Sequence, residues 1–312
     1  FQKSIQDEKN SLIAVELSET SLKDAKAKLE VGIGTKFEVI EANSQLEIDK
    51  QLLKENTTAK EINLILLKEI LNIDFNENIT FEEKHELSGF WSHPLEKILK
   101  SGLEKSYSLK NINIQNSFKR NQAQIFKNAY LPVIFISNSL SSSFSKGSSL
   151  TAQIDPNQTS STYSNTISLN LAWNLFDGGQ NSNSAKSKQA EAEAEKLKYL
   201  NLQNVIRTNI SEAYLNLLKA KNKLISTKQE ILASREALRL ARLRYDVGIS
   251  TLKDVLIKQQ ESTLSKSKNI NAIYNYNINL DKLERLTFLV KSASCNIENN
   301  TNEDSEYSIC DY

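Results

Sequence analysis

The chain has 312 residues and a net charge of +1, so it has no global basic field to attract nucleic acid or an anionic membrane surface. A hydrophobic content of 39% with only 8 glycines and 3 prolines favours long helices with few breaks. No apolar run approaches the ~20 residues that a transmembrane helix needs. The sequence lacks methionine and begins at Phe1 in a helical pattern, which indicates a fragment without its N-terminal part, including any signal peptide.

Residues 1–71 are predicted to form a helical hairpin whose turn occurs again near the end of the chain. Shifting the sequence by 216 positions superposes residues 22–71 on residues 238–287 without a gap. The two stretches share roughly a dozen identities, which is typical of an internal repeat. We therefore interpret them as copies of one duplicated unit.

Each copy is predicted to be a helix, a tight turn and a second, antiparallel helix. A glycine takes the left-handed position that closes the incoming helix, a threonine caps the outgoing helix, and an acid three places later completes a capping box. These residues are Gly32, Thr35 and Glu38 in the first copy and Gly248, Thr251 and Asp254 in the second.

The incoming helices carry a heptad seam in which small residues alternate with large ones, so that a partner helix can approach closely. In the second copy the large residues are Leu217, Leu224, Ile231, Leu238 and Tyr245, and the small ones are Ala213, Ala220, Thr227, Ser234 and Ala241. The first copy keeps this register with Val15, Leu22 and Leu29, and with Ser18 and Ala25 between them.

The middle of the chain begins with a predicted connector over residues 72–92. A helical pattern follows over residues 93–130, with a break near residues 106–108. Residues 131–145 and 166–176 then alternate between apolar and small polar side chains, which predicts two strands of about ten residues each. A polar loop over residues 146–165 joins them, so that residues 131–176 form one strand pair.

The strand pair allows two interpretations. It is either an ordinary hairpin over a soluble core or a pair of transmembrane barrel strands, for which ~9 to 11 residues cross the bilayer. Two strands cannot close a barrel, so the second interpretation requires several chains.

Residues 177–289 are predicted to form the second helical hairpin. Its incoming helix covers residues 181–247, on the order of 100 Å at 1.5 Å per residue, which no compact soluble domain needs. The return helix covers residues 252–289. The tail, residues 290–312, is acidic and rich in Asn and Ser, which predicts disorder. Its two cysteines, Cys295 and Cys310, are compatible with a disulfide or with two free thiols.

We find no constellation of catalytic residues, and we predict neither an enzyme nor a cofactor or metal site. The only histidines are His85 and His93, which lie in a loop without a cysteine or a convincing carboxylate partner. The Gly178-Gly179 pair lacks the Lys-Ser/Thr of a phosphate-binding loop.

Two stretches in this order resemble the TolC family of outer-membrane efflux channels over about residues 1–289. They are Trp-Asn-Leu-Phe-Asp-Gly-Gly at 173–179 and Arg-Tyr-Asp-Val-Gly-Ile-Ser-Thr-Leu-Lys-Asp-Val-Leu at 244–256. The resemblance implies a mainly helical fold, with coiled-coil hairpins forming an α-barrel and strands contributing to a trimeric transmembrane β-barrel. It implies that residues 72–92 belong to an equatorial belt, and that a first strand pair precedes Phe1.

The resemblance also implies roles for the two turns, which would be the periplasmic tips. Gly32, Thr35, Gly248 and Thr251 would form the tip turns and dock a membrane-fusion adaptor. Glu38 would hydrogen-bond to Tyr245 to close the gate. Ser250 stands where the family has an arginine partner, and Asp254 would form an acidic ring at the pore constriction. A second family acid falls on Ile257, so that ring would be single.

The function implied is a passive export conduit of a tripartite efflux or type I secretion system. Its partners would be two further copies of the chain, a periplasmic adaptor, an inner-membrane pump that supplies the energy, and outer-membrane lipid. It would lie in the bacterial outer membrane with a long periplasmic extension. The alternative is a coiled-coil scaffold that binds partner proteins without transport. The alternation over residues 167–175 discriminates between them, because a conduit needs that apolar face in lipid whereas a scaffold would cover it with protein.

Overall fold

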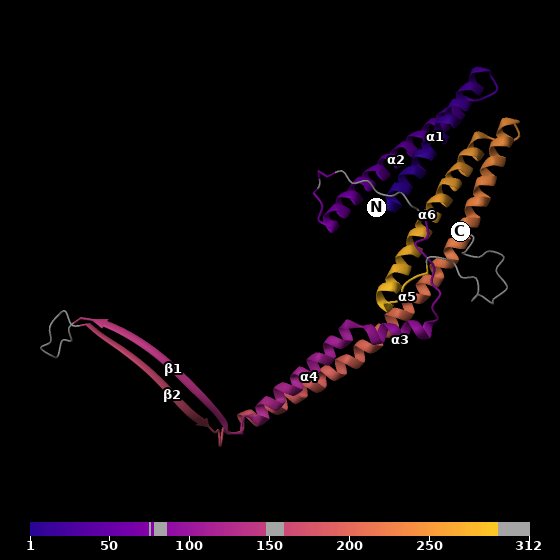
Figure 1. Ribbon diagram of the computed structural model, residues 1–312. Helices are drawn as coiled ribbons and strands as arrows, with labels where there is room; N and C mark the ends of the chain where they lie inside the picture. Colours follow the sequence, from indigo (N-terminus) through magenta and orange to yellow (C-terminus); the bar gives the residue numbers. More distant parts are fainter. Residues whose placement is uncertain (75, 78–85, 148–158, 293–312) are drawn as a thin grey trace. The chain divides into compact units, whose positions relative to one another are not determined.

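The computed structural model describes residues 1–74, 76–77, 86–147 and 159–292. The elements are α1 (Gln2–Glu30), α2 (Lys36–Leu71), α3 (Leu95–Lys105), α4 (Tyr107–Asn128), β1 (Val133–Lys146), β2 (Thr159–Ala172), α5 (Gln180–Asp246) and α6 (Leu252–Thr287) (Figure 1). Among the described residues, none of the helices combines the length and apolar character needed to span a bilayer. The predictions for His85, Cys295, Cys310 and residues 293–312 lie outside this part of the chain.

The chain divides into two compact units, and α5 contributes to both. The first unit comprises Phe1–Lys105 and Ile206–Tyr312, and the second comprises Ser106–Val205. Helices dominate the described residues, which also include one antiparallel strand pair, and this confirms the predicted mainly helical fold class. The 67 residues of α5 lie within one position of the predicted long helix at either end.

In the first unit, α1 and α2 form one antiparallel hairpin, and α5 and α6 form another near their turn (Figure 1). Both hairpins share a cluster of buried side chains that we call the turn core. Its members are Val15, Leu22, Ala25, Ala42, Leu46, Leu238, Ala241, Tyr245, Leu252, Val255 and Leu256. Because α1, α2, α5 and α6 all contribute, this core joins the two copies of the duplicated unit.

A second buried cluster, the base core, lies farther from the turns and includes α3. Its members are Ile98, Ile210, Ala213, Leu217, Ala220, Leu224, Ala272, Ile273, Tyr276, Leu280 and Leu283. Phe90 pairs with Ser292 in an isolated antiparallel bridge, so the segment before α3 is bound to the residues after α6. The base core therefore holds α3 against the α5–α6 hairpin.

The predicted heptad seam of α5 is buried for the most part, and its small residues lie among its large ones. Ile231 and Ser234 are half-buried. The prediction is wrong at Leu29, which is 38% exposed, whereas its counterpart Tyr245 is 7% exposed. The two copies therefore differ at the last turn of the incoming helix, and only the second copy inserts this side chain into the turn core.

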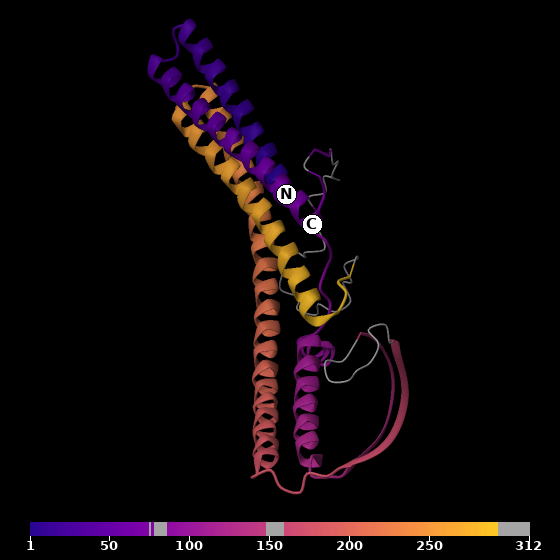
Figure 2. The same cartoon turned by 90° about the vertical axis from the view of Figure 1, so that its left-hand side faces the viewer.

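In the second unit, α4 packs along the first part of α5 (Figure 2). The side-chain amide of Asn116 donates to the Ala192 carbonyl oxygen. Lys119 forms an ion pair of 2.7 Å with Glu191. The predicted helix break before α4 is present, because the Ser106 hydroxyl caps the helix by accepting from the Leu109 backbone N–H at 3.4 Å.

The strands β1 and β2 pair in register from Val133 opposite Ala172 to Lys146 opposite Thr159. The second strand was predicted to cover residues 166–176, but it begins at Thr159 and ends at Ala172. The polar stretch 159–165 is a strand because it completes the ladder with residues 139–146 of β1, a long-range effect that alternation within β2 does not reveal.

The strand pair has two different faces. Serine hydroxyls meet on one face, with Ser137 and Ser168 at 2.8 Å and Ser141 and Ser164 at 2.7 Å. The opposite face carries exposed large side chains, which are Ile134, Ile136, Leu140, Phe144, Tyr163, Ile167, Leu169 and Leu171. These side chains are between 65% and 79% exposed. The chain's own described residues therefore leave this apolar face uncovered.

Candidate functional site

Both interhelical turns close their incoming helix with the same backbone geometry. Gly32 has φ +80° and Gly248 has φ +76°. In the first turn the backbone N–H of Ile33 donates to the Lys28 carbonyl oxygen at 3.0 Å, and the second turn repeats this bond at 2.9 Å. These are Schellman motifs, in which a left-handed glycine lets the chain satisfy the last helical carbonyls.

Both outgoing helices begin with a complete capping box, as predicted. The Thr35 hydroxyl accepts the Glu38 backbone N–H at 3.2 Å, and the Glu38 carboxylate accepts the Thr35 backbone N–H at 2.9 Å. The corresponding bonds between Thr251 and Asp254 are 3.4 and 3.1 Å. Local sequence therefore determines both turns independently of the rest of the chain.

The Asp254 carboxylate is held in its ionised form by these caps. The Thr251 backbone N–H, and then the Thr251 hydroxyl, lower the pKa of Asp254. Because Asp254 is exposed at the start of α6, it presents a fixed negative charge beside the turn.

Tyr245, in the last turn of α5, is the buried residue of the site. Its hydroxyl is buried and has no hydrogen-bond partner among the described residues. Burial raises the pKa of Tyr245 to about 12, and the negative charges of Glu38, Asp24 and Asp246 add to the rise. The tyrosine is therefore neutral, and its ring rather than its hydroxyl makes the contacts.

Lys28 of α1 holds this ring. Its Nζ atom lies 3.4 Å from the centroid of the Tyr245 ring and donates to the Tyr245 backbone carbonyl oxygen at 2.9 Å. The two contacts join the first hairpin to the second beside both turns. Cation–π contacts of this kind are worth roughly 0.5 to 2 kcal/mol, depending on how far they are removed from water.

The expected hydrogen bond between Glu38 and Tyr245 is not formed in this structure. The Glu38 carboxylate is engaged by both the backbone N–H and the hydroxyl of Thr35. Ser250 does not reach across either, since its hydroxyl bonds to the neighbouring Thr251 carbonyl oxygen at 3.4 Å. The structure therefore places Glu38 and Tyr245 in the same region without bringing their oxygen atoms together.

The turns also expose apolar side chains to solvent. Val31 and Ile33 of the first turn are 71% and 75% exposed, and Val247 and Ile249 of the second are 62% and 75% exposed. The corresponding side chains of the two copies are therefore exposed to a similar degree. A displayed apolar tip rimmed by charges is typical of a surface that contacts another protein.

Sequence reasoning missed Lys28, whose ammonium group lies over the Tyr245 ring. Lysines are interspersed along α1, and nothing in its spacing distinguishes Lys28 from them. Its counterpart in the second copy, Arg244, is exposed. The contact arises only when two hairpins pack together, so the repeat comparison gives no signal for it.

The chain is similar to a known protein family in sequence and to solved structures in fold. The profile of the outer membrane efflux protein family matches residues 98–287. That range begins within α3 and ends with α6, and it includes the strand pair and the second turn. No curated protein matches the chain in sequence.

Several solved structures share the fold. The outer membrane protein VceC of Vibrio cholerae is 14% identical with a TM-score of 0.71, over 91% of this chain and 66% of that one. The CmeC outer membrane channel of Campylobacter jejuni is 16% identical with a TM-score of 0.69, over 94% and 61%. The open state of the MtrE outer membrane channel of Neisseria gonorrhoeae is 16% identical with a TM-score of 0.65, over 91% and 64%. The chain thus spans less than two thirds of the length of these channels.

Proposed function

Because the chain belongs to the outer membrane efflux protein family, we propose that it is the channel component of a tripartite efflux or type I secretion system. Family membership identifies an outer-membrane protein of the TolC type rather than an enzyme. In the proposed mechanism three copies form one tube, and cargo passes through it without chemistry on this chain. An inner-membrane pump supplies the energy through a periplasmic adaptor.

The uncovered face of the strand pair is the observation that supports the channel over the scaffold. Its apolar side chains extend over roughly ten residues of each strand, which matches the ~9 to 11 residues that a barrel strand uses to cross a bilayer. The serine face would line a wet lumen. A scaffold would need to cover this face with protein, and no described residue of the chain does so.

The two turns are proposed to be the periplasmic gate and the adaptor-docking tip. The displayed residues Val31, Ile33, Val247 and Ile249 offer the adaptor an apolar contact, with Gly32, Thr35, Gly248 and Thr251 fixing their backbone. Asp254 would add one negative charge per protomer at the constriction.

The latch that keeps the gate closed is proposed to be the Lys28–Tyr245 contact. It joins α1 to α5, whereas the Glu38 carboxylate is used within its own hairpin. Opening would move the second hairpin away from the first and would separate the ammonium group from the ring. Lys28 thereby supplies the cation at a tip where Ser250 replaces the family arginine.

Single-channel conductance of the full-length protein in a planar bilayer tests this proposal. Lys28→Met keeps the aliphatic stem and removes the charge, and Tyr245→Leu removes the ring. We expect both variants to raise a small wild-type current several-fold, because a contact worth roughly 1 kcal/mol corresponds to about a fivefold shift in a closed–open equilibrium.

Tyr245→Phe is the matched control, because it keeps the ring and removes only the unpartnered hydroxyl. We expect its current to equal that of the wild type. A current that rises in Tyr245→Phe and in Glu38→Ala would instead indicate that a hydrogen bond between the Tyr245 hydroxyl and the Glu38 carboxylate keeps the gate closed. Protein that stays soluble without detergent and conducts nothing would refute the channel and leave the scaffold.

A further inference from the structure

A network of polar side chains, buried except at the exposed Gln260, links the two hairpins outside the turns themselves. The Gln259 amide of α6 donates to the Ser18 hydroxyl of α1 at 2.7 Å, and the Ser18 hydroxyl donates to the Asp49 carboxylate of α2. The Gln45 amide donates to the other Asp49 oxygen at 3.0 Å. Gln260 of α6 donates to the Gln45 side-chain oxygen at 2.7 Å, and the Ser21 hydroxyl of α1 donates to the Gln259 side-chain oxygen at 3.3 Å.

Every bond of this network points toward one carboxylate. Asp49 receives one donor on each oxygen, and each donor receives a bond in turn from α6. Ser18 is 0% exposed, Gln259 is 2% exposed and Asp49 is 7% exposed. Such networks strengthen each member when complete, and the removal of one member leaves costly unsatisfied groups.

Asp49 occupies a position where the helix pattern calls for an apolar residue. Ala42, Leu46, Asp49 and Leu53 of α2 follow the spacing of a heptad seam, and Ala42 and Leu46 belong to the turn core. A carboxylate in such a seam is a poor choice for stability alone, because apolar replacements of buried ionic groups are often as stable or more so. Polar groups in seams are best attested as devices that fix the register or arrangement of helices.

The positions of this network in the first copy can be compared with the matching positions in the second copy. Ser18 and Asp49 correspond to Ser234 and Ser265 of the second copy, which also bond to each other, at 2.5 Å. The second copy thus keeps a serine pair inside its hairpin. Gln259 corresponds to Asn43 in the first copy, which is exposed. Only the first copy carries the carboxylate, and only there does the pair extend to the other hairpin.

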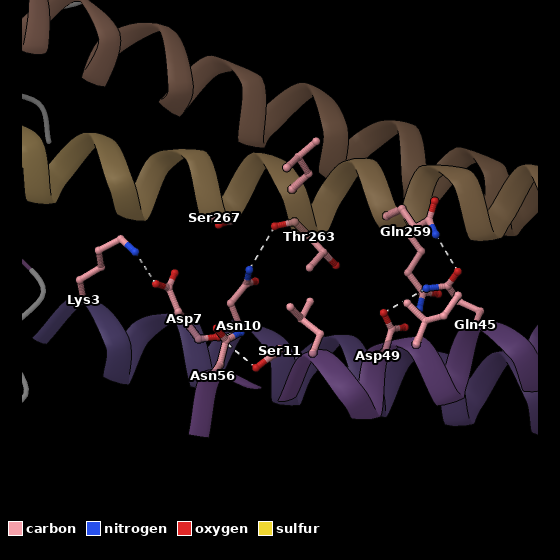
Figure 3. Close-up of a pocket in the computed structure, with 14 residues that line it drawn as sticks. Lys3, Asp7, Asn10, Ser11, Gln45, Asp49, Asn56, Gln259, Thr263 and Ser267 are labelled. Atoms are coloured by element: carbon pink, nitrogen blue, oxygen red, sulfur yellow. Dashed lines mark hydrogen bonds and ion pairs between the residues drawn. The ribbon is translucent and has the colours of Figure 1, made fainter. Parts of the chain in front are cut away.

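A cleft of about 490 Å³ adjoins the network between α1, α2 and α6 (Figure 3). Across it, the Asn10 amide of α1 donates to the Thr263 carbonyl oxygen of α6 at 3.1 Å. Ile48 and Leu264 face this region but stay more than half exposed. At this cleft, directed polar bonds therefore supplement the apolar turn core where the first hairpin meets α6.

We propose that the Asp49 network is a second lock, which holds the first hairpin against α6 in the closed channel and must release when the channel opens. This proposal rests on the proposed gating function, but it concerns side chains outside the turns themselves. Asp49 is a positioning residue in this mechanism, and Gln259 of the moving hairpin is linked to it through the Ser18 hydroxyl. Opening then requires two separate sets of bonds to break, at Lys28–Tyr245 and at Asp49.

The test uses the full-length protein in planar bilayers and includes a variant that gives the first copy a residue of the second. Asp49→Ser gives the first hairpin the serine pair of the second, so the local contact persists while the network is lost. Gln259→Ala removes the α6 side chain that donates to Ser18. We expect each variant to raise the open fraction about two- to tenfold, the range that a single hydrogen bond supports. The double variant should raise it no further than the larger single effect, because both act on one network.

Ser265→Ala is the matched control, because it removes the equivalent bond of the second copy without touching the contact between hairpins. It should leave the open fraction unchanged, and trimer melting temperatures measured alongside should fall by similar amounts in Ser265→Ala and Asp49→Ser. A melting temperature that falls without any change in conductance would overturn the lock. If the wild type conducts and Lys28→Met opens it while the Asp49 and Gln259 variants do not, the second lock fails and the gate stands. If no variant conducts, the proposed function itself fails.

Discussion

At the scale of single residues, the glycine that closes each incoming helix is required by its backbone conformation rather than by a lack of space for a side chain. A Cβ at Gly248 would meet no atom within 4 Å, yet its φ of +76° is one that L residues rarely adopt. We expect Gly248→Ala to lower the free energy of unfolding by about 1 kcal/mol, because alanine is strained in the left-handed region. Chemical denaturation of the full-length protein measures this change.

Gly248→Asn distinguishes strain from any other effect of a new side chain. Asparagine is larger than alanine but tolerates the left-handed conformation. It should therefore be less destabilising than alanine at this position. Equal losses for the two variants would show that conformation does not govern the turn.

Contacts between residues a few positions apart could be predicted from the sequence, whereas contacts between residues on different hairpins could not. The glycine, threonine and acid of each turn act on their own backbone, so sequence spacing is sufficient to predict them. Lys28 and Tyr245 lie on separate hairpins, and their contact depends on how these pack. Asp49 did leave a signal, a charged residue at a seam position, that a comparison of the repeats could have found.

At the scale of elements, Asp177 fixes the junction between the strand pair and α5. Its carboxylate accepts the Asn181 backbone N–H at 2.8 Å, the Tyr130 hydroxyl at 2.7 Å and the Gly179 backbone N–H at 2.9 Å. The indole N–H of Trp173 donates to the Tyr130 carbonyl oxygen at 3.1 Å. The Phe-Asp-Gly-Gly motif thus works as a helix cap with an aromatic partner, at a point beyond the last strand residue.

This cap predicts a loss of stability in acid. The Asn181 N–H, and then the Tyr130 hydroxyl, lower the pKa of Asp177 below its usual value of about 4. Since the folded state favours the ionised form, Asp177 stabilises the fold at pH values above the pKa that it has in the unfolded chain. This stabilisation is lost as pH falls through the lower pKa that Asp177 has in the folded state. The melting-temperature gap between wild type and Asp177→Asn should narrow as pH falls below about 4. A gap that is constant with pH would contradict the assignment.

Gly102 determines how closely α3 approaches its neighbours. A Cβ there would lie 2.3 Å from the Cδ1 atom of Ile210 and 3.1 Å from the Leu286 carbonyl oxygen. We expect Gly102→Ala to cost about 1 to 3 kcal/mol of stability through overpacking. Ile210→Val removes the clashing Cδ1 atom, so adding it to Gly102→Ala should recover part of the loss in thermal unfolding. A double variant that loses the sum of both single effects would refute this packing.

The prediction of elements failed where pairing overrides local pattern. Residues 159–165 contain serine, threonine and asparagine that favour a loop when considered alone, yet they form a strand opposite β1. The helices were predicted within one or two residues because their heptad pattern and caps lie in their own sequence. Local physics thus predicts this chain's helices better than its strands.

At the scale of the whole molecule, the two hairpins have turns of the same structure but contribute different side chains to the contacts between them. The first copy supplies Lys28, which contacts the Tyr245 ring of the second copy. It also supplies Ser18, which accepts from Gln259 of the second copy and donates to Asp49 of its own hairpin. Duplication gives two hairpins of the same form, and divergence of their sequences gives them complementary side chains where they meet. This asymmetry is what a gate between hairpins requires, since identical halves would have no preferred partner.

In the proposed channel the strand pair connects the helices to the membrane, and adjacent residues of β2 test that role. In the proposed trimeric barrel, Leu169 faces lipid and Ser168 faces the lumen. Leu169→Arg places a charge in the hydrocarbon at a cost of roughly 2 to 4 kcal/mol near the bilayer midplane, whereas Ser168→Arg places the same charge in water. We expect Leu169→Arg to reduce the amount of detergent-resistant trimer recovered from outer membranes.

Ser168→Arg should assemble normally and shift ion selectivity toward anions, because its positive charge would line the conducting path. The two variants have the same net charge and lie one residue apart, so a general effect of arginine on folding would affect both. Equal assembly of the two variants would mean that the apolar face is not in lipid. A larger defect from Ser168→Arg would mean that the serine face is the packed one, and either result would restore the scaffold as the better interpretation.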